Sequence, residues 1–188
     1  YTYAFQMTGS DDANGRLEFN LGNTASTAAV HLSNVRIEKT GYEEIKEDTT
    51  KKVLADGNYV YNGSFQEGKN RLGYWDITKP ENATTEVTGL EDGRRLKVVS
   101  PKGTVVTAGQ QGLALSEDTK YVLSFSAQAN EAETMTVHVA GQKFQAELTN
   151  EKKNYSFSFQ TAADLTDKNI SFDLGLGTTV YLDDVRID

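Results

Sequence analysis

The last stretch of the chain occurs twice, and this repeat limits what the chain can fold into. Residues 170–187 have the pattern of two short strands around a Gly/Thr turn, and residues 17–37 match them in order, with three extra residues in the first loop. The match extends upstream, where residues 1–6 lie over residues 155–160. A repeated supersecondary pattern decides how the rest of a sequence is divided. The matched pairs are Phe19/Phe172, Leu21/Leu174, Gly22/Gly175, Leu32/Leu182, Val35/Val185, Arg36/Arg186 and Ile37/Ile187.

Residues 58–188 consist mainly of short segments with the composition of β-strands. The segments are rich in β-branched and aromatic residues, recur roughly every 10 to 15 residues, and show no helical period. This spacing predicts an all-β fold, an antiparallel β-sandwich of jelly-roll type, which also protects its strand edges. The predicted strands include residues 86–88, 95–99, 104–107, 121–127, 135–139, 143–146 and 155–160, followed by the two closing strands.

The repeat and the composition together divide the chain into three parts. Residues 58–188 form a complete module, and residues 1–39 match the C-terminal strands of a preceding, truncated module of the same type. Residues 40–57 are dense in charge and poor in apolar residues, which indicates a linker, either a short helix or an extended connector. The alternating aromatics of residues 1–39 need a partner sheet. They must dock on the complete module or pair between two copies, which would give a dimer.

Charge and composition exclude several kinds of partner. The net charge of −8 argues against nucleic acid, which binds to basic surfaces. The chain has no cysteine, so disulfides and thiolate metal sites are excluded. No apolar run approaches the length of a membrane span, and we expect no membrane partner. The acidic balance leaves carboxylates available for a hard metal ion such as Ca²⁺.

Four motifs in residues 58–188 resemble a known family. They are Asn62–Gly68, Gly73–Trp75, Leu113–Ala127 and Leu182–Val185, which occur in the order and spacing of the CenC-like carbohydrate-binding modules of families 4, 9, 16 and 22. The resemblance implies a jelly roll that binds a β-linked polysaccharide, such as a β-glucan, without catalysis. It further implies an accessory module of a secreted or cell-surface glycoside hydrolase, with the catalytic domain and neighbouring modules as partners in the same chain.

A carboxylate in the last strand suggests a structural metal ion. Strand alternation puts Asp183 on one face with Tyr181, Val185 and Ile187, and Asp184 on the other. A carboxylate turned toward an apolar layer needs a cation or several hydrogen-bond donors. Calcium is one solution, and backbone N–H groups or an arginine are the other.

The resemblance implies which residues would hold the calcium ion. The matching positions are Gln66, Asp92 with its neighbouring backbone carbonyls, and Asp183. This chain departs from the family pattern at Gln66, where a glutamate is usual. In the first copy of the repeat Ser33 replaces Asp183, so that copy lacks the strongest ligand.

Sugar binding needs an aromatic face for the pyranose ring and fixed amides for its hydroxyl groups. Tyr74 and Trp75, the only tryptophan, are the first aromatic candidates, although a tryptophan at a strand start can equally belong to the core. Glutamine is uncommon in strands for structure alone. The candidate amides are Gln110, Gln111, Gln128 and Gln145, which lie in or beside predicted strands.

The sequence lacks the patterns of an enzyme. Glycoside hydrolysis needs two converging carboxylates, whereas alternation turns Asp183 and Asp184 to opposite faces. His31 and His138 stand in strand patterns without a nucleophile motif nearby, and no phosphate-binding loop occurs. The prediction is therefore a non-catalytic binding module. The alternative is a structural or spacer β-sandwich of a multidomain surface protein, with no ligand of its own.

Overall fold

The computed structural model describes residues 1–5, 16–20, 29–38, 51–90, 93–175 and 177–188, and it divides the chain into two units. The first unit is Tyr1–Asp48 and the second is Thr49–Asp188. In the first unit the described residues form no strand, and their large apolar side chains are exposed. In the described residues of the chain, no helix has the length and apolar character that a membrane crossing requires.

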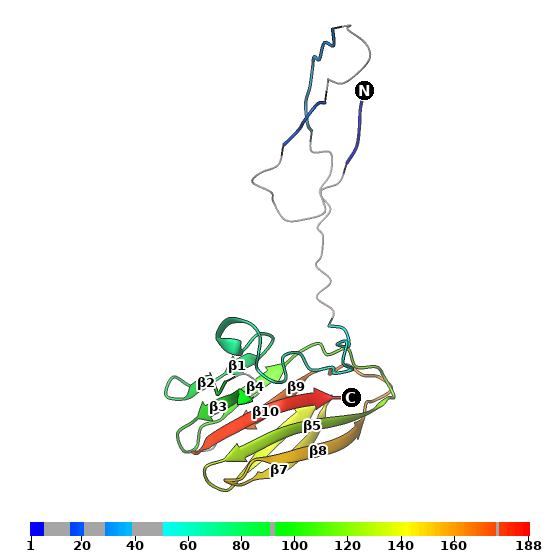
Figure 1. The fold of residues 1–188 in the computed structure, drawn as a ribbon. Helices are drawn as coiled ribbons and strands as arrows, with labels where there is room; N and C mark the ends of the chain where they lie inside the picture. The colour runs from blue at the N-terminus through cyan, green and yellow to red at the C-terminus, as the bar shows by residue number, and fades with distance from the viewer. Residues whose placement is uncertain (6–15, 21–28, 39–50, 91–92, 176) are drawn as a thin grey trace. The chain divides into compact units, whose positions relative to one another are not determined.

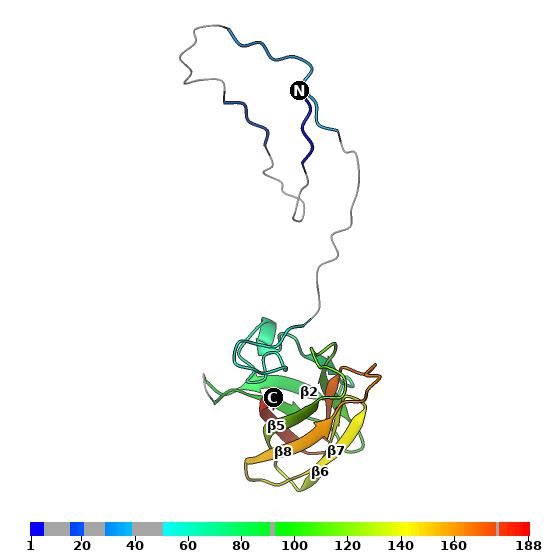
Figure 2. The same cartoon turned by 90° about the vertical axis from the view of Figure 1, so that its right-hand side faces the viewer.

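The second unit is a sandwich of two antiparallel five-stranded sheets, which confirms the predicted fold class (Figures 1 and 2). Sheet A has the strand order β1-β4-β9-β6-β7, and sheet B has the order β2-β3-β10-β5-β8. A short 3₁₀ helix, η1 (Lys69–Arg71), precedes the first strand. The strands are β1 (Asp76–Thr78), β2 (Thr84–Thr88), β3 (Arg95–Val99), β4 (Val106–Gln110), β5 (Lys120–Ala129), β6 (Glu133–Val139), β7 (Gln142–Leu148), β8 (Lys153–Gln160), β9 (Ile170–Leu174) and β10 (Thr179–Ile187).

The chain crosses repeatedly between the sheets, so its C-terminal strands are separated in space. Strand β8 is at the edge of sheet B beside β5, β9 lies between β4 and β6 in sheet A, and β10 lies between β3 and β5 in sheet B. Each of the last two strands therefore needs two partners from earlier in the chain. This interleaving closes the sandwich around one apolar core.

Aromatic side chains fill the middle of that core. Trp75 stacks on Phe65 with ring centroids 5.3 Å apart, and its ring lies 6.2 Å from that of Phe172 in sheet A. Phe172 in turn meets the edge of Phe125 from sheet B at 5.2 Å. These contacts join the two sheets, and the indole Nε1 donates a hydrogen bond to the carbonyl oxygen of Asn62.

A β-bulge in β10 changes which side chains face the core. Asp183 pairs with Ser126 and Arg186 with Ser124, so β10 carries one more residue than β5 over this interval, and Asp184 has a φ of 53°. Leu182 before the bulge and Val185 after it both lie in the core. The prediction that Asp183 shares a face with Val185 and Ile187 is therefore wrong, because alternation does not continue through a bulge.

The residues ahead of β1 are tied to the sandwich by hydrogen bonds. The Asn58 amide donates to the carbonyl oxygen of Val185 and accepts from the backbone N–H groups of Val60 and Ile187. The Tyr61 hydroxyl accepts from the Lys52 N–H and donates to the Lys52 carbonyl oxygen, both at 2.9 Å. Residues from Lys51 onward thus contact the sandwich, although the sequence placed them in the linker.

Candidate functional site

The outer face of sheet A is built from polar side chains of all five strands. Register places these residues in two rows across the strands, while their neighbours along each strand, such as Ala108, Phe172 and Val137, are buried in the core. One row is Thr78, Thr107, Asp173, Thr136 and Gln145. The other row is Asp76, Gly109, Ser171, His138 and Lys143, in which the glycine has no side chain.

Asp173 is a carboxylate near the middle of this face that side chains of both neighbouring strands contact. Its Oδ1 accepts a hydrogen bond of 3.3 Å from the Thr107 hydroxyl on β4, and its Oδ2 lies 3.3 Å from His138 Nε2 on β6. Within the part of the chain that the structure describes, the side chains of Ser171, Thr136 and Gln145 make no hydrogen bond. Sheet A therefore presents a fixed charged centre surrounded by amide and hydroxyl groups with unused hydrogen-bonding capacity.

An aromatic corner stands at the β1 edge of sheet A. Tyr74 is 54% exposed, and its ring centroid is 5.0 Å from that of Tyr61. The Lys51 ammonium lies 5.7 Å from the centre of the Tyr61 ring. Gln110, which is buried, fixes this corner because its Oε1 accepts from the Tyr61 N–H and its Nε2 donates to the Tyr61 carbonyl oxygen.

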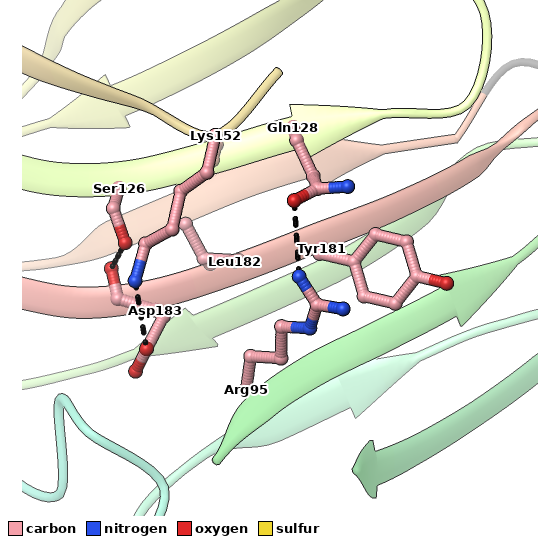
Figure 3. Close-up of a pocket in the computed structure, with 8 residues that line it drawn as sticks. Arg95, Ser126, Gln128, Lys152, Tyr181, Leu182 and Asp183 are labelled. Carbon is pink, nitrogen blue, oxygen red and sulfur yellow. Dashed lines mark hydrogen bonds and ion pairs between the residues drawn. The ribbon is translucent and has the colours of Figure 1, made fainter. Parts of the chain in front are cut away.

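The outer face of sheet B has a small hollow whose polar groups are already paired (Figure 3). The guanidinium of Arg95 lies 4.1 Å from the centre of the Tyr181 ring and donates a 3.0 Å hydrogen bond to Gln128 Oε1. Beside the hollow, Lys97 makes an ion pair with Glu86 at 2.8 Å. Each of these groups has a partner within the sheet, and one face of the Tyr181 ring is covered.

The two neighbouring aspartates of β10 converge on one lysine at this hollow. Lys152 Nζ lies 3.5 Å from Asp183 Oδ2 and 3.4 Å from Asp184 Oδ2. The prediction that these carboxylates point to opposite faces is wrong, because the bulge at Asp184 turns its side chain back toward Asp183. Burial raises the pKa of Asp183, the charge of Asp184 raises this pKa further, and the Asp184 N–H and Lys152 oppose the shift.

The described part of the predicted calcium site is occupied by protein groups. Gln66 Oε1 accepts a hydrogen bond from Arg94, and Asp183 is bound by Lys152 and by the Asp184 N–H. Asp92 lies outside the described residues. Within the described ranges, no three His, Asp or Glu side chains gather into a metal-binding group. The predicted ligand set is therefore incomplete among the described residues, and calcium stays a prediction.

The structure separates the residues that the sequence grouped as sugar ligands. Trp75 is 6% exposed and belongs to the core, Gln110 holds the backbone of Tyr61, and Gln128 faces the opposite side of the sandwich from Gln145. Tyr74, Gln111 and Gln145 are exposed. Sequence reasoning missed Asp173, Ser171, His138 and Thr136 on sheet A. Their alternation with Phe172 and Val137 was visible, but only the pairing of β9 with β6 brings them together.

The second unit is a β-sandwich with a polar outer face on sheet A, and its family shows the class of protein. The family described as "Carbohydrate binding domain" (CBM_4_9) matches residues 57–180, and the chain belongs to this family. Domains of this class bind carbohydrate without catalysis. No curated protein gives a significant match to the sequence.

Solved structures of carbohydrate-binding modules share the fold. One described as "CBM4 structure and function" is 19% identical, with a TM-score of 0.51, and covers 68% of this chain and 97% of its own. The module TmCBM61 in complex with β-1,4-galactotriose is 15% identical, with a TM-score of 0.50, and covers 70% of this chain and 97% of its own. A structure of another kind, the enzymatically active domain of tailspike protein 4 of bacteriophage CBA120, is 14% identical, with a TM-score of 0.55, and covers 69% of this chain and 21% of its own.

Proposed function

We propose that the outer face of sheet A binds the saccharide, and that the ligand is a neutral β-linked polysaccharide such as a β-glucan. The observation that carries this proposal is a set of hydroxyl and amide side chains on sheet A that make no hydrogen bond to another described residue, namely Ser171, Thr136 and Gln145. Such groups both donate and accept, as sugar hydroxyls do. Strands about 4.8 Å apart give a five-stranded face about 19 Å across, which is wide enough for several sugar units.

The aromatic corner and Asp173 have distinct roles in this proposal. Tyr74 offers an exposed ring to the apolar side of a pyranose at the β1 edge. Asp173, held by Thr107 and His138, accepts hydrogen bonds from sugar hydroxyls at a fixed position. A carboxylate that is already oriented loses little conformational entropy when the ligand binds.

The outer face of sheet B is the weaker candidate for a neutral ligand. Arg95, Gln128, Lys97 and Lys152 are all paired with neighbouring side chains. A sugar would have to replace hydrogen bonds to charged groups, which contribute roughly 1.5–3 kcal/mol each. The proposal therefore leaves Gln128 out of the binding site and retains Tyr74, Gln111 and Gln145 among the predicted residues.

The family membership supports a proposal about the wider role. We infer that the domain is an accessory module of a secreted or surface glycoside hydrolase, which it holds close to the polysaccharide. The family membership supports a carbohydrate as the ligand. The β-1,4-galactotriose bound to TmCBM61 is consistent with a β-linked ligand. A spacer β-sandwich without a ligand is the competing function, and binding measurements separate the two.

Affinity electrophoresis of the 188-residue chain tests the proposal. We expect soluble β-glucan in the gel to retard the chain, and the double variant Ser171→Ala/Gln145→Ala to bind roughly tenfold more weakly, because two hydrogen bonds of about 0.7 kcal/mol each amount to a factor of ten. Tyr74→Ala should also weaken retardation. Xylan and galactomannan gels report the choice of polysaccharide.

A matched variant on the other sheet provides the control. Lys97→Ala removes a half-buried side chain from sheet B and should leave retardation unchanged. Equal losses for Lys97→Ala and for the double variant would move the binding face to sheet B or make the effect nonspecific. A chain that no β-glucan, xylan or mannan retards would support the spacer function instead.

A further inference from the structure

A lysine ahead of the family match lies at the aromatic corner of Tyr61 and Tyr74. The match begins at residue 57, whereas the Lys51 ammonium already donates a hydrogen bond of 3.3 Å to Gln110 Oε1. The same ammonium lies 5.7 Å from the centre of the Tyr61 ring. Lys51 is therefore part of the folded domain, although the family match does not include it.

The segment that carries Lys51 is held at two points. Gln110 Oε1 accepts from the Lys51 ammonium and also from the Tyr61 N–H. The Tyr61 hydroxyl accepts from the Lys52 N–H and donates to the Lys52 carbonyl oxygen. Since the exposed ring of Tyr74 lies 5.0 Å from that of Tyr61, these bonds give the ammonium a defined position close to Tyr74.

The ammonium group of Lys51 has hydrogen-bonding capacity that the protein leaves unused. A lysine ammonium carries three N–H donors and no acceptor. Among the described residues, Gln110 is the one acceptor that Lys51 bonds, and no carboxylate forms an ion pair with Lys51. This distinguishes it from Lys97 and Lys152 on sheet B, which are paired with carboxylates. The remaining donors of Lys51 are available to a ligand.

The surroundings of Lys51 strengthen any hydrogen bond that it makes to a ligand. Burial lowers the pKa of Lys51, and the carboxylate of Asp76 on β1 acts in the opposite direction. A partly buried donor competes with less water than a donor on an open surface does. Hydrogen bonds from a charged donor are also roughly twice as strong as those between neutral groups.

The position of Lys51 is at the border of the sheet A face. Asp76, whose charge acts on Lys51, pairs with Gly109 in one of the two rows of outward residues. Gln110, the acceptor for Lys51, follows Gly109 directly in β4. A sugar unit that stacks on Tyr74 and reaches this row therefore passes close to the ammonium.

We propose that Lys51 contacts the saccharide, as a donor of hydrogen bonds to hydroxyl groups of the sugar unit that stacks on Tyr74. This inference rests on the proposed function of sheet A and extends its binding site beyond the matched residues 57–180. A sugar hydroxyl both accepts and donates, so it can accept from the ammonium while its own O–H donates to the Asp76 carboxylate. Lys51 thus fixes the orientation of the sugar unit at the β1 edge.

Isothermal titration calorimetry of the 188-residue chain with cellohexaose and with barley β-glucan tests the proposal. Lys51→Met keeps the apolar stem and removes the charge and the donors, and we expect it to bind roughly tenfold more weakly. Lys51→Arg keeps a charged donor and should retain most of the affinity. Lys153→Met, at an exposed lysine of β8, changes the net charge equally and should bind as the native chain does.

NMR of chains labelled with ¹³C at the lysine Cε separates contact from positioning. The signal that is absent from Lys51→Met belongs to Lys51, and we expect it to shift with cellohexaose and to saturate at the calorimetric Kd. The unfolding midpoint of Lys51→Met should stay within about 2 °C of the native value, because only one hydrogen bond within the protein is lost. Weaker binding by Lys51→Met with an unshifted Lys51 signal would overturn the proposal and leave Lys51 as a positioning residue.

The outcomes also separate this inference from the proposed function. If Lys51→Met binds as tightly as Lys153→Met while Ser171→Ala/Gln145→Ala binds more weakly, Lys51 makes no contact and the sheet A site stands. If the native chain binds neither cellohexaose nor barley β-glucan, the proposed β-glucan ligand and the role of Lys51 are both wrong.

Discussion

Asn62 is the single residue on which the segment ahead of β1 depends most. Its Oδ1 accepts from the N–H groups of Gln66 and Glu67, and its Nδ2 lies 3.0–3.2 Å from the carbonyl oxygens of Glu67, Arg71 and Gly73. Its φ of 49° also favours asparagine over most residues. The side chain thus replaces secondary structure in a loop that has almost none.

Replacing Asn62 should therefore destabilise the sandwich. For Asn62→Ala we expect a loss of about 3 kcal/mol in the free energy of unfolding, because several backbone groups lose their partner and alanine is strained at a positive φ. Urea unfolding followed by tryptophan fluorescence measures this, since Trp75 donates to the Asn62 carbonyl oxygen. Asn154→Ala, at an exposed asparagine of β8, is the control and should change stability by less than about 0.5 kcal/mol.

Asp183 gives a prediction about pH. Burial raises the pKa of Asp183 in the folded state above 3.8, its value in the unfolded chain. Asp183 therefore makes its full contribution to the free energy of unfolding below pH 3.8, and this contribution is lost as the pH rises through the pKa of the folded state. Asp183→Asn removes this pH-dependent loss of stability. In chelator, we expect the variant to gain stability relative to the native chain as the pH rises above about 4.

The same variant tests the predicted calcium ion. If Ca²⁺ binds Asp183, the native chain will gain thermal stability from added calcium and Asp183→Asn will not. Asp184→Asn is the control, because Asp184 is exposed and contacts the same lysine. Melting curves with calcium and with chelator distinguish the ion from the Lys152 pair. Identical curves for the native chain under the two conditions would contradict the calcium prediction.

At the scale of elements, the bulge of β10 is the feature that alternation could not predict. The sequence predicted β10, and Val185 and Ile187 are buried as expected, but Leu182, which alternation placed on the opposite face, is buried with them. It did not predict that Asp184 takes a positive φ, and so it assigned both aspartates to the wrong surroundings. The proposed binding face was not predicted for a related reason. The pairing of β9 with β4 and β6 joins segments far apart in the sequence, and periodicity within one strand does not specify it.

Strand β1 was missed because it is only three residues long, Asp76–Thr78, and lies at a sheet edge. The sequence left open whether Trp75, immediately before β1, contacts sugar or belongs to the core, and the structure shows that it belongs to the core. The family motifs were the more reliable guide to the fold, because each lies where the chain packs closely. Gly63 in the first motif is an example.

Gly63 is required because the backbone of the β10 bulge lies directly against it. A Cβ at this position would lie 2.0 Å from the Val185 carbonyl oxygen, while the Gly63 carbonyl oxygen accepts from the Val185 N–H. We expect Gly63→Ala to lower the free energy of unfolding by about 2–4 kcal/mol, because backbone must move on both sides. Gly93→Ala is the matched control, since nothing lies within 4 Å of its Cβ position. Similar unfolding midpoints for both variants would show that the bulge tolerates a side chain.

At the scale of the whole molecule, the two units differ in where their stability comes from. Among the described residues, every member of the buried core lies between Val60 and Ile187, so the second unit has a core of its own. Residues 51–57 belong with it, because Lys51 bonds Gln110, Lys52 bonds Tyr61, and Asp56 pairs with Arg186. The sequence-based boundary at residue 58 cuts through these contacts.

Two truncations test this boundary. A chain of residues 49–188 should keep the unfolding midpoint and the β-glucan retardation of the 188-residue chain, because it keeps the whole core and the contacts of residues 51–57. A chain of residues 58–188 should unfold roughly 5 °C lower, since the loss of three polar contacts costs about 1–2 kcal/mol in a domain of this size. Differential scanning calorimetry measures both. If residues 58–188 and residues 49–188 have equal unfolding midpoints, residues 51–57 are a linker. If residues 49–188 have a lower midpoint than the 188-residue chain, the first unit stabilises the second.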